Sequence, residues 1–162
     1  MLVTPPRQVS LVFGGLGGST VEGPVKKLPK TKNSLVLRTD FSDDSAWESI
    51  CAAIRQPVGE FRAYVDCASD PEYDGLTVEQ LTTLAPKGSD HTFVFIVDRL
   101  ALTHPDHPIL VVDLYDEPGR TFRVIPSEMW GVENNLSIAN MDFYEFADSI
   151  DQDGIFRGFP ES

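Results

Sequence analysis

Two continuous apolar runs near the middle of the chain constrain the fold more than any other feature. They are HTFVFIVD (91–98) and ILVVDLY (109–115). Runs of this length and composition are typical of strands that are covered on both faces. Only ten residues separate them, which is short for the crossover between parallel strands, so we expect antiparallel neighbours. The pair predicts the centre of a sheet.

The segments before these runs alternate between strand and helix patterns. SLVLRT (34–39) and EFRAYVDC (60–67) predict strands, and in the second one Arg62, Tyr64 and Asp66 alternate with the apolar side chains. The stretch between them predicts a helix capped by Ser42 or Ser45. Its apolar residues share one face at helical spacing: Trp47, Ile50, Cys51 and Ile54. TVEQLTTLAP (77–86) predicts a short helix with Thr77 and Gln80 at capping-box spacing.

The C-terminal part predicts one more strand and one more helix. RTFRVI (120–125) follows the turn DEPG and predicts a half-exposed strand. DFYEFADSI (142–150) predicts a helix capped by Asp142, with Glu145 at the capping-box position. The order β-α-β-α-β-β-β-α predicts an α/β fold, a single-domain sandwich in which helices flank a mixed, partly antiparallel sheet.

Residues 1–33 differ in composition from the rest. They are rich in Gly, Pro and Lys, and we expect a flexible extension before a domain at 34–162. The segment VSLVF (9–13) within it is a candidate edge strand. FGGLGGST (13–20) lacks the Lys of a phosphate-binding loop and favours a linker. No secretory signal or membrane span is predicted.

Charge is distributed unevenly along the chain, whose net charge is −12. Residues 1–33 hold five basic residues and one acidic residue, whereas the remainder holds eight basic and 24 acidic residues. An acidic body repels phosphate, so nucleic-acid binding is not expected. The charge is typical of a surface that keeps a protein soluble, and the alternative is attraction of a basic partner or a cation. Two cysteines on apolar faces indicate reduced core thiols and a cytoplasmic protein.

Three stretches resemble a known family. They are LVLRTDFSDDSAWESICAAI (35–54), YDGLTVEQL (73–81) and the long segment 109–159, which contains LVVDLYDEPGRTFRVIPSEMWGVENNLSIANMDF. The chain resembles, over about residues 34–159, a family of small bacterial proteins that carry a domain of unknown function. This resemblance implies no activity, cofactor or catalytic residue.

Asp113 interrupts an otherwise apolar strand. A buried carboxylate needs a partner, and Arg123 on the next strand is the candidate if both side chains share a face. The alternative is a functional carboxylate. The sequence therefore indicates a buried polar residue at 113 without assigning its role.

The segment PSEMWGVENNLSIANM (126–141) follows no clean period, because Gly131 and the Asn134–Asn135 pair disfavour a long helix. We expect one or two irregular turns fixed by Trp130. Two interpretations remain: a buried polar staple that satisfies backbone groups, or a recognition surface. The candidate binding residues are Arg120, Arg123, Glu128, Trp130, Glu133, Asn134, Asn135 and Asn140.

Metal-binding patterns are weak. His104 and His107 have H-x-x-H spacing within a proline-rich loop. Asp151 and Asp153 precede Gly154 as in part of a calcium loop, although the template fails at both ends. No cofactor and no catalytic residue are predicted.

Three functions are compatible with these patterns. The first is a non-enzymatic binding module that acts through protein–protein contact, in the manner of an immunity or regulatory protein. The second is a small-molecule-binding protein or hydrolytic enzyme that uses a cleft of charged and polar residues: Asp113, Glu117, Arg120, Arg123, Glu128 and Asn134. The third is an acidic protein that binds calcium or a basic peptide. The sequence names neither the partner nor the oligomeric state.

Overall fold

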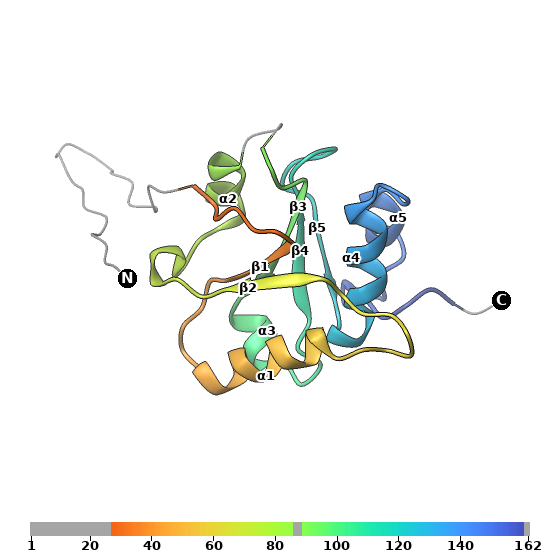
Figure 1. Ribbon diagram of the computed structural model, residues 1–162, viewed down its shortest axis with the longest axis horizontal. Helices are drawn as coiled ribbons and strands as arrows, with labels where there is room; N and C mark the ends of the chain where they lie inside the picture. Colours follow the sequence, from red (N-terminus) through yellow and green to blue (C-terminus); the bar gives the residue numbers. More distant parts are fainter. Residues whose placement is uncertain (1–26, 86–88, 161–162) are drawn as a thin grey trace, which may run out of the picture.

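A computed structural model describes residues 27–85 and 89–160, which form one six-stranded sheet with helices on both faces (Figure 1). The strand order is β2-β1-β3-β4-β5-β6. The strands are β1 (Ser34–Arg38), β2 (Val65–Ala68), β3 (Phe93–Val97), β4 (Ile109–Asp113), β5 (Thr121–Val124) and β6 (Ile155–Phe156). The α/β class and the flanked sheet are as predicted; the segment 9–13 lies outside the described residues.

The sheet is mixed. β1 is parallel to both β2 and β3, and β6 is parallel to β5. β3 and β4 are antiparallel, which confirms the prediction from their short connection, and β5 continues the antiparallel half. All five β3 residues are buried, as expected for a strand covered on both faces.

The sheet divides the hydrophobic core into two layers, and helices cover each of them. One face is covered by α1 (Asp44–Arg55), α3 (Arg99–Thr103), α4 (Met129–Ser137) and α5 (Phe143–Ala147). The other face is covered by α2 (Val78–Leu84) and the short 3-10 helix η2 (Pro71–Tyr73). Figure 1 shows α2 on the opposite side of the strands from α4 and α5.

The predicted helix boundaries are confirmed in part. The apolar stripe of α1 is buried as expected, but the residue that caps this helix is Asp43, whose side chain accepts a hydrogen bond from the Ala46 N–H. Both predicted capping boxes are present, one at Thr77–Gln80 and one at Asp142–Glu145. A capping box needs only residues within one turn, and local sequence therefore specifies it well.

Two helices were not predicted. The connection between β3 and β4 contains α3, capped by Asp98. The expectation of irregular turns over 126–141 is wrong, because the 3-10 helix η3 (Pro126–Glu128) leads into the nine-residue α4. Met129 and Val132 of α4 are fully buried. Burial of this apolar side offsets the poor helix propensity of Gly131 and the asparagines.

The last residues before β1 lie against the body. Leu28 packs on the core beneath α2, and the Tyr73 hydroxyl donates a hydrogen bond to the Lys27 carbonyl. His91 Nε2 lies 2.9 Å from the Pro29 carbonyl oxygen. Residues 27–33 thus contact the sheet domain, whereas 1–26 lie outside the described part of the chain. No described helix has the length and apolar character needed to cross a membrane.

Candidate functional site

Asp113 is buried, as predicted, but its partners are backbone groups. Its carboxylate accepts hydrogen bonds from the N–H groups of Tyr115, Asp116 and Glu117 at 2.9–3.2 Å. It therefore organises the turn between β4 and β5. The proposed ion pair with Arg123 is absent, because Arg123 points to the opposite end of the strand and pairs with Asp98.

The two predicted binding arginines are engaged in ion pairs within the chain. Arg123 donates to both carboxylate oxygens of Asp98, at 3.0 and 2.7 Å, and also to the Pro108 carbonyl. Arg120 contacts Glu117 at 3.1 Å and Asp148 at 2.7 Å. All of these partners lie outside α4.

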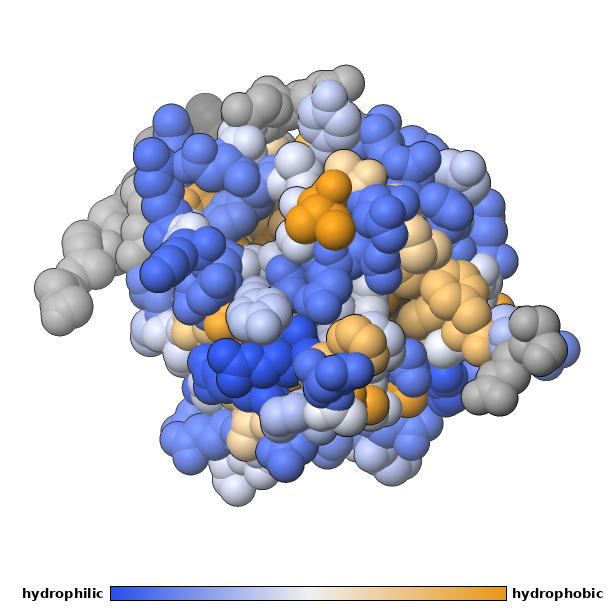
Figure 2. All heavy atoms as spheres, turned by 45° about the vertical axis from the view of Figure 1, so that its right-hand side comes forward, coloured by the Kyte–Doolittle hydropathy of each residue, from blue (hydrophilic) through white to orange (hydrophobic). Residues whose placement is uncertain are grey.

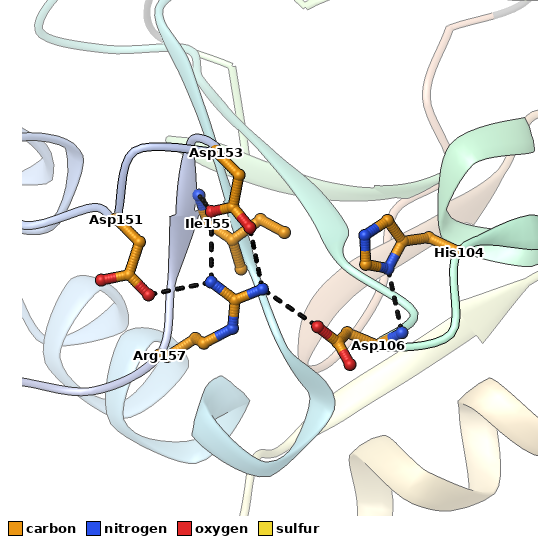
Figure 3. A network of polar contacts seen from close by, with 6 residues as sticks. All are labelled: His104, Asp106, Asp151, Asp153, Ile155 and Arg157. Atoms are coloured by element: carbon orange, nitrogen blue, oxygen red, sulfur yellow. Dashed lines mark hydrogen bonds and ion pairs between the residues drawn. The ribbon is translucent and has the colours of Figure 1, made fainter.

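The aspartates of the incomplete calcium loop surround a guanidinium. Arg157 contacts Asp151, Asp153 and Asp106 at 2.8–3.1 Å, and Asp153 binds it through both oxygens (Figure 3). These hydrogen bonds raise the pKa of Arg157, with Asp153 as the largest cause. A cation of the chain itself therefore occupies the centre of this carboxylate cluster.

The two loop histidines make separate local contacts. His104 Nδ1 accepts a hydrogen bond from the Asp106 N–H at 3.0 Å, and His107 Nδ1 lies 2.8 Å from the Ala101 carbonyl oxygen. Within the described ranges, no group of three or more His, Cys, Asp or Glu side chains has an arrangement suited to a metal ion. The histidines thus stabilise the connection between α3 and β4.

The two cysteines are free thiols in contact with each other. Cys51 is buried on α1 and Cys67 is half-buried on β2. The hydrogen bond between them raises the pKa of Cys51, with burial as a further cause, and lowers the pKa of Cys67. They complete the packing of α1 on the edge of the sheet.

The carboxyl ends of β1 and β3 are the usual ligand site of an open α/β sheet. The strand order reverses there, since α1 and α2 lie on opposite faces, and ligands commonly bind at such a point. A pocket of about 180 Å³ lies here, bordered by Thr39 and Asp98. Its size is below that of typical ligand pockets.

The charges at this end of the sheet compensate one another. Arg38 is 4% exposed and donates to the Asp40 carbonyl, to Ser69 and to Asp44. Its guanidinium also lies 4.3 Å from the centre of the Phe41 ring. Together with the Arg123–Asp98 pair, these contacts leave the carboxyl end with its cations and anions matched.

The amino end of the same strands contains a buried carboxylate with only uncharged partners. Glu133 of α4 is 3% exposed. Its Oε2 accepts from the Ser34 hydroxyl at 2.8 Å, and its Oε1 accepts from the Tyr64 N–H at 3.0 Å and from Asn134 Nδ2 at 2.9 Å. None of the ion pairs within residues 27–85 and 89–160 involves Glu133.

Glu133 lines a pocket of about 530 Å³ at this amino end. The pocket is within the size range of ligand sites in proteins. Asn33 and Ser34 border it from the start of β1, and Tyr64 from before β2. Asn134 borders it from α4, and Ile138 from the position after this helix. Charged or titratable side chains on its walls besides Glu133 are Lys32, Tyr64, Asp90 and His91.

The surface beside the pocket exposes large apolar side chains. Ile138 is 73% exposed, and Phe61 and Tyr64 are half-exposed. Trp130 stacks on Phe61 with ring centres 4.7 Å apart, and the Asn134 amide donates to the Arg62 carbonyl. Figure 2 shows the side of α4 and α5 as a mostly hydrophilic surface with separate hydrophobic areas.

The remaining predicted residues flank this surface on α4 and η3. The Asn135 amide donates to the Gly131 carbonyl at 2.7 Å, and the Asn140 amide donates to Asn135 Oδ1 at 2.8 Å. Glu128 is half-buried against the backbone of Gly158, and this burial raises its pKa. The segment 126–141 thus bonds backbone groups through Glu133 and Asn135, as the staple interpretation expects. Trp130 and Asn134 are half-buried and Ile138 is exposed, and a recognition role for them stays a prediction.

The sequence analysis missed Ser34, Phe61, Tyr64 and Ile138 as site residues. The alternation of residues 60–67 had already placed Tyr64 opposite to the apolar side chains, which is a usable signal for exposure. Ser34 carried no signal, because its contact with Glu133 spans 99 positions of the sequence.

Comparison with protein families identifies most of the chain. Residues 33–159 match the model of a domain of unknown function, DUF6924. The chain therefore belongs to the DUF6924 family. A search of curated proteins found no match.

Proposed function

We propose that this DUF6924 protein is a non-enzymatic binding module that acts in the cytoplasm by contact with a basic segment of a protein partner. The partner docks on the α4 face, defined as Phe61, Tyr64, Trp130, Asn134 and Ile138, together with the adjoining pocket. The observation that carries the proposal is Glu133, a buried carboxylate on the wall of a large pocket with only uncharged hydrogen-bond donors around it.

The charge of the domain favours a basic partner. Residues 34–162 hold 24 acidic and eight basic residues, and the field of such a body accelerates association with a cationic segment. A cation next to Glu133 would offset the cost of burying its charge. Nucleic acid is disfavoured by the same field.

The apolar residues of the α4 face supply the contact area. Aromatic side chains dominate the energetics of protein interfaces, and Trp130 stacks on Phe61 beside the pocket. Ile138 has the highest exposed fraction among the large apolar residues of the described chain. The free thiols of Cys51 and Cys67 agree with a reducing compartment.

Affinity capture followed by reconstitution tests the proposal. The full chain captures proteins from an extract of its native host, and each candidate, identified by mass spectrometry, is purified and its Kd is measured. Phe61→Ser and Ile138→Ser are each expected to raise this Kd by about tenfold, equivalent to about 1.4 kcal/mol.

Tyr144→Ser is the matched control, because Tyr144 is a half-exposed large side chain on α5, outside the α4 face. It is expected to leave the Kd unchanged. Equal effects of Tyr144→Ser and Ile138→Ser, or a partner whose contact region is acidic, would refute the proposed function.

A further inference from the structure

The hydrogen bonds of Glu133 define what the pocket can accept. A carboxylate offers about four acceptor positions, two on each oxygen. Oε1 accepts from the Tyr64 N–H and from Asn134 Nδ2, which uses both of its positions. Oε2 accepts only from the Ser34 hydroxyl, so one position remains open on this oxygen.

Because only one acceptor position on Glu133 is open, the carboxylate is expected to bind lysine and arginine side chains with different affinities. A guanidinium binds a carboxylate best through two parallel N–H donors that contact both oxygens, as Arg123 does with Asp98. Glu133 has no free position on Oε1 for the second donor. An ammonium group is compact and binds as a point charge through single hydrogen bonds, which suits the open position on Oε2.

The other walls of the pocket contain groups that attract an ammonium group, and one charged side chain, Lys32, that repels it. Asp90 adds a second carboxylate, which also contacts the Lys30 ammonium at 3.5 Å. The Tyr64 ring adds an aromatic surface that attracts cations, and the Arg62 guanidinium lies 5.1 Å from its centre. The volume of about 530 Å³ leaves room for the four-carbon stem of a lysine. Ile138 and Tyr64 supply apolar contacts along such a stem.

We propose that the Glu133 pocket accepts the ammonium group of a lysine side chain from the protein partner, and that it discriminates against arginine. This inference rests on the proposed function and names the group that the α4 face recognises. The lysine ammonium donates one hydrogen bond to Glu133 Oε2, while Ser34, Tyr64 and Asn134 keep the carboxylate in place.

A titration of the ¹⁵N-labelled full chain tests the discrimination. The probes are the N-acetyl, N-methylamide derivatives of lysine, arginine and norleucine, and the reporters are the Tyr64 amide and the Asn134 side-chain amide. The lysine probe is expected to give saturable shifts, with a Kd at least tenfold below that of the arginine probe. The norleucine probe is expected to give no saturation, because it has the stem without the charge.

Two variants connect these shifts to Glu133. Glu133→Gln is expected to abolish saturation, whereas Glu48→Gln, the same change at an exposed site on α1, is expected to leave the Kd unchanged. Ser137→Lys introduces an ammonium four residues after Glu133 on the exposed side of α4, where it competes for the open position. It is expected to weaken the lysine probe at least tenfold and to raise Tm, so a folding defect of Glu133→Gln would not obscure the result.

Other outcomes would overturn the inference. Equal affinity for the lysine and arginine probes would reject the discrimination, and binding that is unaffected by Ser137→Lys would reject the position. Spermidine that binds at Glu133 at least a hundredfold more tightly than the lysine probe would identify a small amine as the occupant. If capture of the partner depends on Ile138 but is insensitive to Ser137→Lys, the lysine pocket is wrong while the binding module stands.

Discussion

The two ends of the parallel half of the sheet differ in how their buried charged side chains are paired. At the carboxyl ends of β1 and β3, Arg38 and Arg123 are bound by acidic side chains of the same chain. At the amino ends, Glu133 is at least as buried as either arginine but accepts hydrogen bonds from uncharged groups alone. The carboxyl end is complete in itself, whereas the amino end can still gain from a cation.

This difference is the reason why we propose the amino end as the partner's site. The strand-order reversal favours the carboxyl end as a ligand site, but the charges there already satisfy one another and the pocket is small. The amino end combines a pocket nearly three times larger with an open acceptor on Glu133. The binding site that we propose therefore follows local charge balance and not the reversal of strand order.

The largest expected effect is at the carboxyl end. Arg38→Ala removes a buried guanidinium that binds three groups and packs on Phe41, and we expect it to lower the free energy of unfolding by about 3 kcal/mol. Asp44→Asn removes the charge of its 82% exposed partner and is expected to cost less than about 0.5 kcal/mol. Urea denaturation measures both; similar losses would mean that the ion pair, not burial, dominates.

The second effect concerns the matched pair at this end. Asp98→Asn leaves the largely buried Arg123 without its carboxylate and weakens the cap of α3, so we expect a loss of about 2 kcal/mol. Asp116→Asn, in the exposed turn after β4, serves as the control with the same change of charge. A loss below that of the control would show that the carboxyl end is not balanced by this pair.

A smaller loss is expected at the amino end. Glu133→Gln keeps the shape of the side chain and leaves no cation unpaired, so we expect a cost of about 1 kcal/mol, mainly from a mismatched donor. The same urea series measures it. A cost equal to or above that of Asp98→Asn would contradict the contrast between the two ends and would assign Glu133 a purely structural role.

The smallest expected effect on the free energy of unfolding is at Glu128, whose carboxyl group is half-buried beside α4. Burial raises the pKa of Glu128 above its usual value of 4.5, so the folded chain binds this proton more tightly than the unfolded chain. The free energy of unfolding therefore falls as pH rises through the interval between the unfolded and folded pKa values. Glu128→Gln removes this term and is expected to stabilise the chain at pH 7, by less than about 1 kcal/mol because the group is screened by solvent.

The same variant is expected to have no stabilising effect at pH 3, where Glu128 is protonated in both states. Thermal unfolding at the two pH values measures the difference. Glu48→Gln, at a solvent-exposed position on α1, is the control at both pH values. A gain at pH 3 that equals the gain at pH 7 would show that the effect has no connection with ionisation.

Site residues were predictable only where the signal is local. The backbone partners of Asp113 lie two to four residues away, yet the sequence favoured a distant partner, Arg123, because turn geometry was not specified. Trp130 and Asn134 lie on one helix, α4, which the sequence analysis did not predict. The segment forms a helix because Met129 and Val132 are buried. Their burial depends on the packing of this segment against the sheet.

The sequence by itself determined the class of fold, the burial of β3, the antiparallel pairing with β4, and the caps at Thr77 and Asp142. Each of these depends on residue types within a short window. Only the tertiary structure decided that Glu133 meets Ser34 and Tyr64, which lie 99 and 69 positions away. Such contacts follow from strand order and from the docking of α4 on the sheet, and residue patterns within a single element specify neither.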